Sequence, residues 1–346
     1  MAYYPQKETS SMARPNVSII VLSYNSKNDL KTFLSSLEKL SYPNYEVILA
    51  DNASKDDSPK YVKDCFAWVK IIKNSKNLGY AEANNQAAKA SNGEYLLFLN
   101  ADTWVKPNLL DALVSTVTSN QKIGVSACMQ LSYDGKRFLN TGLTTDLFSH
   151  PVLTNSQQSI LYSDGASLFV KKSVFQQIGG FDPQYFMYGE DVDLCWRVLL
   201  AGYDVVSVPS AVIGHKSGGT LIQSGETYQI SKFRRYLAER NSLRTILKNY
   251  SVHTLIFLLP ICIVTMLLQG VLFFLIRQSA FAILEMRAIF WNLRMLKDTF
   301  ALRNLAQKNR RLSDRAIIGR MSKAIGFARA FANMKQDSLS IKWERQ

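Results

Sequence analysis

Short apolar runs alternate with amphipathic helical patterns from Val17 onwards. Strands that are apolar along their whole length and separated by helices are typical of β-α-β units, which build a parallel sheet covered on both faces. The pattern therefore predicts an α/β fold with a mostly parallel sheet flanked by helices. The predicted strands cover residues 17–22, 45–50 and 94–99, and the predicted helices cover residues 29–40 and 81–90.

Polar residues follow each of the three predicted strands. Ser23, Tyr24 and Asn25 come after the first strand, Asp51 and Asn52 after the second, and Asn100 and Asp102 after the third. Any one of these groups could form an ordinary turn. In open α/β sheets, however, ligands bind beyond the carboxyl ends of the strands. Three polar groups at that edge therefore predict a ligand site.

Asn100 and Asp102 are two residues apart at the end of an extended segment, so we expect their side chains to point the same way. Together they can hold a hard divalent cation whose remaining positions are filled by phosphate oxygens and water. His215, in a glycine-rich loop after the apolar segment 203–208, is the candidate third ligand. A lone histidine is more often structural or exposed, and the neighbouring Lys216 could equally neutralise phosphate charge.

Three carboxylates lie within four residues at Glu190, Asp191 and Asp193, directly before an apolar helical pattern. Acidic side chains are stabilised in the first turn of a helix by the helix dipole. One interpretation is a simple acidic N-cap. The other is a catalytic site, because a carboxylate held there at the rim of a pocket is a candidate general base. These residues alone leave both interpretations open.

Charge is divided unevenly along the chain. Residues 1–231 have a net charge of −1, residues 232–253 of +5 and residues 277–346 of +10, whereas residues 254–276 carry no charge. Two basic segments around an apolar one fit an anionic membrane surface better than a nucleic acid, since each Lys or Arg near such a surface contributes about 1 kcal/mol. The sequence therefore predicts a membrane surface, and no nucleic acid, as a partner.

The uncharged stretch Thr254–Ile276 is long enough to cross a bilayer. A single crossing would place the strongly basic C-terminal segment outside the cell, against the preference of Lys and Arg for the cytoplasmic side. Pro260 can instead bend the stretch into a re-entrant or in-plane element, and residues 281–305 suit an interfacial helix. The alternative is a buried helix of a soluble fold with a packed C-terminal cap, which leaves open a dimer interface and hence a homo-oligomer.

Cysteine spacing and the N-terminus indicate the compartment. Cys65, Cys128, Cys195 and Cys262 are scattered, which predicts neither disulfides nor structural zinc. The N-terminus is polar and lacks the apolar core of a signal peptide. We expect a flexible segment at residues 1–16, a catalytic domain at 17–250 and a basic, hydrophobic helical region at 251–346. The protein is expected on the cytoplasmic face of the cell membrane.

An ordered set of segments covers much of residues 17–250. The segments are Val17 to Asn25, Ala50 to Asp56, Asn77 to Tyr80, Asn100 to Asp102, Gly179 to Asp182 and Gly189 to Leu194. Together they resemble glycosyltransferase family 2, in its rhamnosyltransferase-like group. The resemblance implies a GT-A (Rossmann-like) fold with a mixed, mostly parallel sheet, and an inverting transfer of a sugar from a nucleoside-diphosphate donor.

The resemblance also implies roles for individual residues. The donor site would include Ser23, Tyr24, Asn25, Asp51, Asn52, Asn77, Gly79 and Asn100; Asp102 and His215 would bind Mg²⁺ or Mn²⁺; Asp191 would be the catalytic base, and Glu190 and Asp193 would orient it or the acceptor. Asn100 stands where a D-x-D motif has its first aspartate, so Asp102 is the only carboxylate of that pair. Glu82 and Ala83 fall where many relatives carry glycine.

The implied activity is metal-assisted transfer of rhamnose or another deoxyhexose onto a cell-surface polysaccharide or a lipid-linked glycan. Two alternatives are a processive polysaccharide synthase and a catalytically degenerate membrane scaffold of a glycan assembly complex. Synthases of the first kind carry a Q-x-x-R-W motif, and Glu239–Arg240–Asn241 stands in that region here. Against the scaffold, the chain retains Asp51, Asp102 and Asp191.

Overall fold

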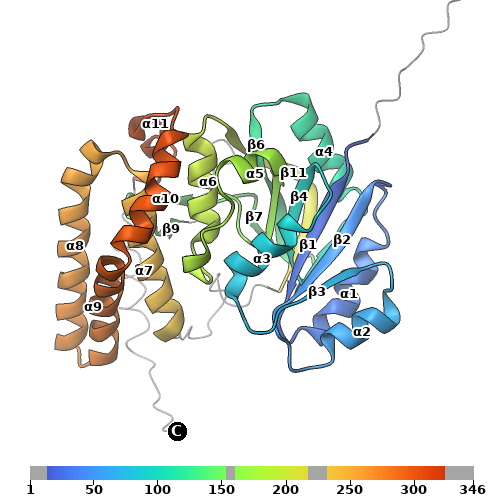
Figure 1. Ribbon diagram of the computed structural model, residues 1–346, viewed down its shortest axis with the longest axis horizontal. Coiled ribbons are helices and arrows are strands. Elements are labelled where there is room, and N and C mark those ends of the chain that lie inside the picture. Colours follow the sequence, from blue (N-terminus) through green and yellow to red (C-terminus); the bar gives the residue numbers. More distant parts are fainter. Residues whose placement is uncertain (1–13, 153–159, 217–231, 324–346) are drawn as a thin grey trace, which may run out of the picture.

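The computed structural model describes residues 14–152, 160–216 and 232–323. Figure 1 shows a central sheet with helices on both faces and, beside it, a layer of C-terminal helices. Residues 1–13 of the predicted flexible segment, residues 217–231 of the loop after His215 and residues 324–346 of the basic C-terminal region lie outside the described residues.

In the described part of the chain, nine strands form one mixed sheet in the order β3-β2-β1-β4-β10-β6-β11-β5, with β7 paired to β6. The strands are β1 (Val17–Ser23), β2 (Tyr45–Asp51), β3 (Lys70–Lys73), β4 (Tyr95–Asn100), β5 (Thr103–Val105), β6 (Ile123–Ser132), β7 (Phe138–Asn140), β10 (Ser167–Lys171) and β11 (Asp204–His215). Strands β1 to β4 are mutually parallel, and β10 runs antiparallel between β4 and β6. A separate pair is formed by β8 (Thr144–Thr145) and β9 (Pro151–Val152). The predicted mixed α/β sheet is confirmed.

Helices cover both faces of this sheet. They are α1 (Lys27–Leu37), α2 (Ser58–Cys65), α3 (Gly79–Lys89), α4 (Leu109–Ser119), α5 (Lys172–Gln177) and α6 (Glu190–Leu200). Ile19 and Val21 of β1 point into a core with α1, α2 and α4, whereas Ile20 points into the core with α3, α5 and α6. Because both faces are buried, the strand is apolar at successive positions.

Three elements differ from the sequence prediction. Strand β11 continues to His215 instead of ending near residue 208, because a register shift between Val208 and Val212 accommodates Pro209 within the strand. Helix α8 (Val252–Leu275) runs through Pro260 as one helix. The predicted helix at 281–305 is divided at Met295 into α9 (Ser279–Arg294) and α10 (Leu296–Lys308).

The C-terminal helices are anchored to the sheet domain. Helix α7 (Lys232–Asn249) packs against α6, α9 and α10, and α11 (Asp314–Ile318) contacts α6. Backbone N–H groups of Arg311 and Ser322 donate to the carbonyls of Leu200 and Thr145 at 2.6 and 2.8 Å. The boundary at residue 250 stays a prediction, since the helices on either side of it share one packed layer.

Helix α8 lies at the outer edge of this layer, with α9 antiparallel beside it (Figure 1). Within the described residues it is the one helix that is long and apolar enough to cross a membrane, and 22% of its most apolar window is buried inside the protein. Its outward side chains, which include Phe257, Leu268 and Phe274, are largely exposed. The interpretation of this stretch as the buried core helix of a soluble fold therefore does not match its burial.

Candidate active site

The carboxyl edge of the sheet brings together the polar ends of three strands. Strand β1 lies between β2 and β4, so Ser23 is opposite Asp51 and Leu22 is opposite Asn100. Both Ser23 and Asp51 are buried, and among the described residues the Ser23 Oγ and the Asp51 Oδ1 have no hydrogen-bond partner. Buried polar atoms are normally paired. These two atoms therefore mark a place where a polar ligand could supply the missing hydrogen bonds.

The loops beyond β1 and β2 are joined by Asn25. Its Oδ1 accepts from the backbone N–H of Lys55 at 2.7 Å, and its own N–H donates to the Ser54 Oγ at 2.9 Å. Asn25 has a φ of 53°, a left-handed conformation that asparagine tolerates better than most residues. The neighbouring Tyr24 keeps an exposed ring. Asn25 thus shapes the loop, and Tyr24 is left free to contact a ligand.

Asn52 and Asn77 organise the next loop. The Asn52 Nδ2 donates to the Asn77 Oδ1 at 2.7 Å, and the Asn52 Oδ1 accepts from the Leu78 N–H at 2.9 Å. Gly79 has a φ of +78°, and a Cβ there would lie 2.5 Å from the Phe186 carbonyl oxygen. Asn52, Asn77 and Gly79 therefore bring the loop before α3 against the segment that precedes Asp191.

Asp102 and His215 meet at the far side of the same edge. The Asp102 Oδ1 is 3.5 Å from the His215 Nε2, because β11 pairs with β5 and places His215 opposite Thr103. The chain turns at Ala101 and Asp102, so the argument that Asn100 and Asp102 share one side of an extended strand does not apply. Within the described residues, no group of three His, Cys, Asp or Glu side chains is placed to hold a metal.

The charges of this pair are coupled. Burial disfavours ionisation of Asp102, but the hydrogen bond and charge of His215 outweigh burial, and the pKa of Asp102 is lowered. Burial likewise disfavours protonation of His215, but Asp102 and the charge of Asp164 raise the pKa of His215. Lys216 is engaged elsewhere, since its ammonium forms an ion pair with Asp29 and lies over the Tyr133 ring.

Asp191 lies in the first turn of α6, after Gly189, which takes a left-handed conformation with a φ of +85°. Its Oδ2 accepts from the Gly165 N–H at 3.0 Å, and its Oδ1 accepts from the Val192 N–H at 2.8 Å. Burial, followed by the charge of Asp164, raises the pKa of Asp191 to about 7. A carboxyl group with such a pKa can accept a proton near neutral pH.

The other two carboxylates of the cluster differ from Asp191. Glu190 is buried, its Oε2 has no hydrogen-bond partner among the described residues, and burial and the charge of Asp191 raise the pKa of Glu190 well above its usual value. The Asp191 side chain is only half-buried. Asp191 is therefore the member of the pair that solvent and substrate can reach.

Asp193 points away from the sheet edge. Its carboxylate is fully buried and forms ion pairs with Arg197 at 2.6 Å and Lys248 at 3.0 Å, and Asn249 donates to it at 3.1 Å. The structure therefore does not bring Asp193 to a place where it could contact an acceptor. It anchors α6 instead.

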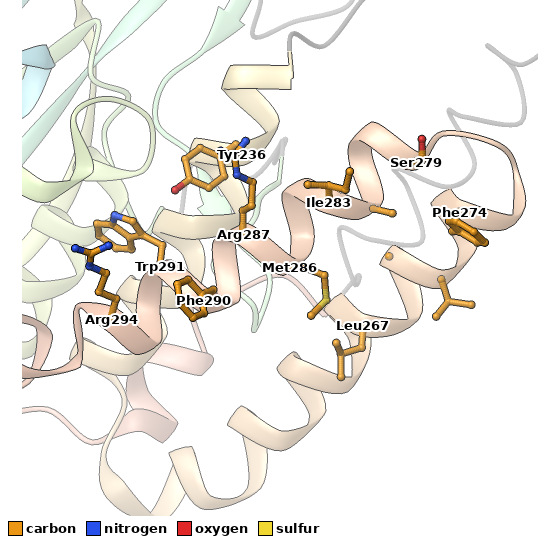
Figure 2. Close-up of a pocket in the computed structure, with 13 residues that line it drawn as sticks. Tyr236, Leu267, Phe274, Ser279, Ile283, Met286, Arg287, Phe290, Trp291 and Arg294 are labelled. Carbon is orange, nitrogen blue, oxygen red and sulfur yellow. The ribbon is translucent and has the colours of Figure 1, made fainter.

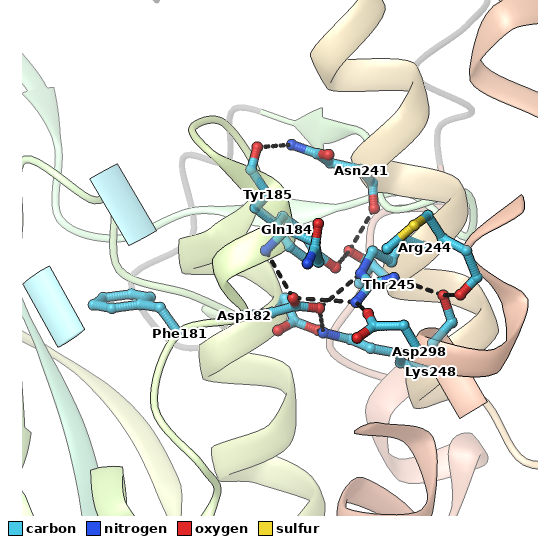
Figure 3. Close-up of polar contacts among 12 residues, drawn as sticks. Phe181, Asp182, Gln184, Tyr185, Asn241, Arg244, Thr245, Lys248 and Asp298 are labelled. Carbon is cyan, nitrogen blue, oxygen red and sulfur yellow. Dashed lines mark hydrogen bonds and ion pairs between the residues drawn. The ribbon is translucent and has the colours of Figure 1, made fainter. Parts of the chain in front are cut away.

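Lys248 also pairs with a second buried carboxylate, Asp182, and Figure 3 shows these two residues beside Arg244 and Asp298. Asp182 accepts from Lys248 at 2.6 Å and from the Arg244 Nε at 2.7 Å, and Arg244 also pairs with Asp298 on α10. This network ties the segment before Asp191 and helix α6 itself to α7 and α10. The position of Asp191 thus depends on the C-terminal helices.

The contributions of Asp164 and Tyr80 to the site were not identified from the sequence. The negative charge of Asp164 raises the pKa values of Asp191 and His215, so it acts on both halves of the site. Gly165 directly follows Asp164, and its carbonyl accepts from the Tyr80 hydroxyl at 2.6 Å. In the sequence, the pair Asp164–Gly165 before an apolar run is indistinguishable from a turn.

Comparisons with known proteins show which families this chain is similar to. The model of the family described as Glycosyl transferase family 2 matches residues 18–180, and that described as N-terminal domain of galactosyltransferase matches residues 162–217. An N-acetylglucosaminyl-diphospho-decaprenol L-rhamnosyltransferase of Mycobacterium tuberculosis is 28% identical over 58% of this chain and 76% of its own length. The O-antigen biosynthesis protein RfbC of Myxococcus xanthus is 30% identical over 62% of this chain and 18% of its own length.

Solved structures share the fold. GalNAc-T7, solved with UDP, GalNAc and Mn²⁺, matches with a TM-score of 0.55 and 19% identity, over 70% of this chain and 49% of that chain. A mannosyltransferase from Pyrobaculum calidifontis, solved with GDP-Man and Mn²⁺, matches with a TM-score of 0.50 and 19% identity, over 68% of this chain and 64% of that chain. This chain thus spans less than two thirds of each of these structures.

Proposed function

Because this chain is a glycosyltransferase with a family 2 domain and a GT-A fold, we propose that it transfers a sugar from a nucleoside-diphosphate donor with inversion, using Asp191 as the base. The observation that carries the proposal is the state of Asp191: half-buried, raised in pKa to about 7, and held by Gly165 beside the strand ends. Rhamnose or another deoxyhexose is the proposed sugar, by similarity to the rhamnosyltransferase relative.

The donor would lie along the strand ends. The buried Ser23 Oγ and Asp51 Oδ1, which have no partner in the part of the chain that the structure describes, can hydrogen-bond the nucleoside, and the exposed ring of Tyr24 can pack on it. Asn100 at the end of β4 is part of the same edge. Because an unsatisfied buried polar group costs about 1–3 kcal/mol, a bound nucleoside would recover this free energy.

A divalent cation, Mg²⁺ or Mn²⁺, fits the pair of Asp102 and His215. The lowered pKa keeps the Asp102 carboxylate ionised at neutral pH, and carboxylate oxygen and imidazole nitrogen are ligands of such ions. Two protein ligands leave positions for donor phosphate oxygens, and the bound ion would act as a Lewis acid on the departing diphosphate. His215 must lose its proton to bind, so we expect metal affinity to rise with pH.

Asp191 would take the proton of the acceptor hydroxyl as that oxygen attacks the anomeric carbon. A single displacement of this kind inverts the anomeric centre, and the proton ends on the Asp191 carboxylate while the electron pair of the broken bond leaves with the diphosphate. The N–H groups of Gly165 and Val192 hold the carboxylate in one orientation. A base with a pKa near the working pH contributes about 10²–10⁴-fold to the rate.

The purified protein, incubated with a panel of nucleoside-diphosphate sugars, is expected to hydrolyse one donor slowly and to transfer its sugar once an acceptor is added. Chelation by EDTA should remove the activity, and Mg²⁺ or Mn²⁺ should restore it. The matched variant Asp102→Asn should need a higher metal concentration for half-maximal donor binding. Full activity in EDTA would contradict the metal, and inertness towards every donor would contradict the enzyme.

The dependence of kcat/KM on pH should show whether Asp191 is the base, because the neighbouring charge of Asp164 can be removed. Since the base must be ionised, we expect kcat/KM to rise with pH through about 7 and to be lost below it. Replacing Asp164 with asparagine removes the charge that helps to raise this pKa, so the acidic limb should move to lower pH. A limb that stays in place in Asp164→Asn would show that another group titrates.

We further propose attachment to the cytoplasmic face of the cell membrane and a lipid-linked or surface-polysaccharide acceptor. The exposed apolar face of α8 and the basic segments on either side of it support the first point. The name of the rhamnosyltransferase relative includes a diphospho-decaprenol acceptor, which supports the second. A carbonate wash of cell membranes that released all of the protein would contradict attachment.

A further inference from the structure

A groove of about 850 Å³ lies between α8 and α9, on the exposed side of the C-terminal helical layer. Its walls are almost entirely apolar and include Leu267, Val271, Phe274, Ile283, Met286 and Phe290. Ligand pockets for small molecules typically have volumes of about 300–1,000 Å³. The groove can therefore hold a substantial ligand, and the ligand must be mostly apolar.

The two ends of the groove differ in chemistry. Figure 2 shows Tyr236, Trp291, Arg287 and Arg294 towards one end, whereas Phe274 lies at the other, beside the turn that joins α8 to α9. Arg287 and Arg294 are exposed, and neither forms an ion pair within the described residues. Two exposed cations at one end of an apolar groove match an amphiphile that has an anionic head and a hydrocarbon chain.

The cationic end faces the active-site side of the molecule. The Arg240 guanidinium lies 4.3 Å from the centroid of the Trp291 ring and donates to the Tyr185 carbonyl at 2.8 Å. The adjacent Asn241 donates to the Tyr188 carbonyl at 2.6 Å. Tyr188 is three residues before Asp191. One continuous set of contacts thus joins the head end of the groove to the loop that carries the base.

We propose that this groove binds one prenyl chain of a lipid-linked acceptor, with its phosphates held by Arg287 and Arg294 and its chain directed towards the α8–α9 turn. This inference rests on the proposed function, because it assigns the acceptor's lipid to a site beside the transfer centre. A bulk phospholipid would be held equally well anywhere along the exposed face of α8. A site with its cations on the side of the catalytic loop suits a lipid whose head must reach Asp191.

Direct binding can be tested on the full-length protein with a benzophenone-bearing farnesyl diphosphate as the probe. Irradiation should label peptides of α8 and α9, and unlabelled farnesyl diphosphate should compete. Inorganic diphosphate should compete poorly because it has no hydrocarbon chain. Phosphatidylcholine vesicles should compete poorly because the lipid head carries no net negative charge. This measurement does not require transfer, so it remains informative if every nucleotide sugar proves inert; labelling without transfer would reject the proposed function and keep the groove.

A matched pair of variants separates the groove from general membrane contact. Val271 lines the groove, whereas Leu268 is exposed on the same helix and is not part of the lining. Val271→Trp should weaken probe binding about ten-fold or more, since each methylene group excluded from an apolar site costs about four-fold in affinity. Leu268→Trp should bind as the unaltered protein does.

The arginines are tested by comparing two ligands. The double change Arg287→Gln and Arg294→Gln should remove most of the preference for farnesyl diphosphate over farnesol and leave farnesol binding unchanged. Equal losses in Val271→Trp and Leu268→Trp would overturn the proposal. Labelling by a photoreactive phosphatidylcholine that farnesyl diphosphate fails to displace would assign the groove to bilayer lipid. Dimer dissociation caused by Val271→Trp would assign the groove to a second copy of the chain. Either result would also overturn the proposal.

Discussion

The Asp191→Asn variant is expected to lose sugar transfer by about 10²–10⁴-fold, because asparagine cannot take the acceptor's proton. Donor binding should change little, since the proposed donor site lies at the strand ends and at Asp102 and His215, not at Asp191. The measurement is single-turnover transfer at pH 8 beside the donor dissociation constant. The asparagine amide has one acceptor oxygen in place of two, so it can keep the hydrogen bond from Gly165 or the one from Val192, and we expect the loop to shift only locally.

Glu190→Gln is the matched control for this experiment. Burial and the charge of Asp191 raise the pKa of Glu190 and so disfavour its ionised form; glutamine keeps a neutral side chain of the same shape, and we expect a much smaller loss of transfer. Both variants should remain folded, since each removes a carboxyl group that burial disfavours when it is ionised. Turnover in Asp191→Asn close to that of the unaltered protein, or a greater loss in Glu190→Gln, would remove Asp191 from its proposed role.

The second large effect is expected for Asp182→Asn, in the free energy of unfolding. Asp182 is buried between Arg244 and Lys248, and these two cations, which outweigh the effect of burial, hold its pKa well below the usual range. Removing its charge leaves buried cations without their main partner, a change that typically costs about 3–5 kcal/mol. Urea unfolding at pH 7 measures this difference.

Asp298→Asn provides the matched control. Asp298 pairs with the same Arg244, but its side chain is 43% exposed, and exposed ion pairs contribute about 0–1 kcal/mol. The contribution of Asp182 to stability also depends on pH. Because the pKa of Asp182 is lower in the folded protein, this contribution is present above the unfolded pKa of about 4 and is lost as the pH falls below that value. Similar losses in the two variants at pH 7 would show that the buried network contributes little to stability.

Much of the sheet could be predicted from local pattern. The apolar runs at 17–22, 45–50 and 94–99 became β1, β2 and β4, because strands buried on both faces must be apolar at successive positions. Parallel pairing then places their carboxyl ends at one edge, so Ser23, Asp51 and Asn100 become neighbours without any further information.

Strand β11, which the sequence predicted to end near residue 208, depends on distant partners. Strand β11 extends to His215 only because β6 and β5 supply hydrogen bonds on either side and a bulge absorbs Pro209. The roles of Asp164 and Asp193 have the same origin. Asp164 is close to Asp191 because β10 folds back beside β4, and Asp193 is drawn away from the edge because Lys248, fifty-five residues later, lies behind α6.

Sequence alone therefore determined the alternation of strands and helices, the edge of the sheet at which the predicted donor-site residues meet, the position of the acidic helix start and the presence of an uncharged stretch between basic ones. These follow from periodicity and charge along the chain, which are local properties. Only the tertiary structure decided which carboxyl group is accessible, which is buried with a raised pKa and which is paired with a cation. The pKa of a carboxyl group depends on burial and on charges within a few ångströms, and packing alone brings those charges together.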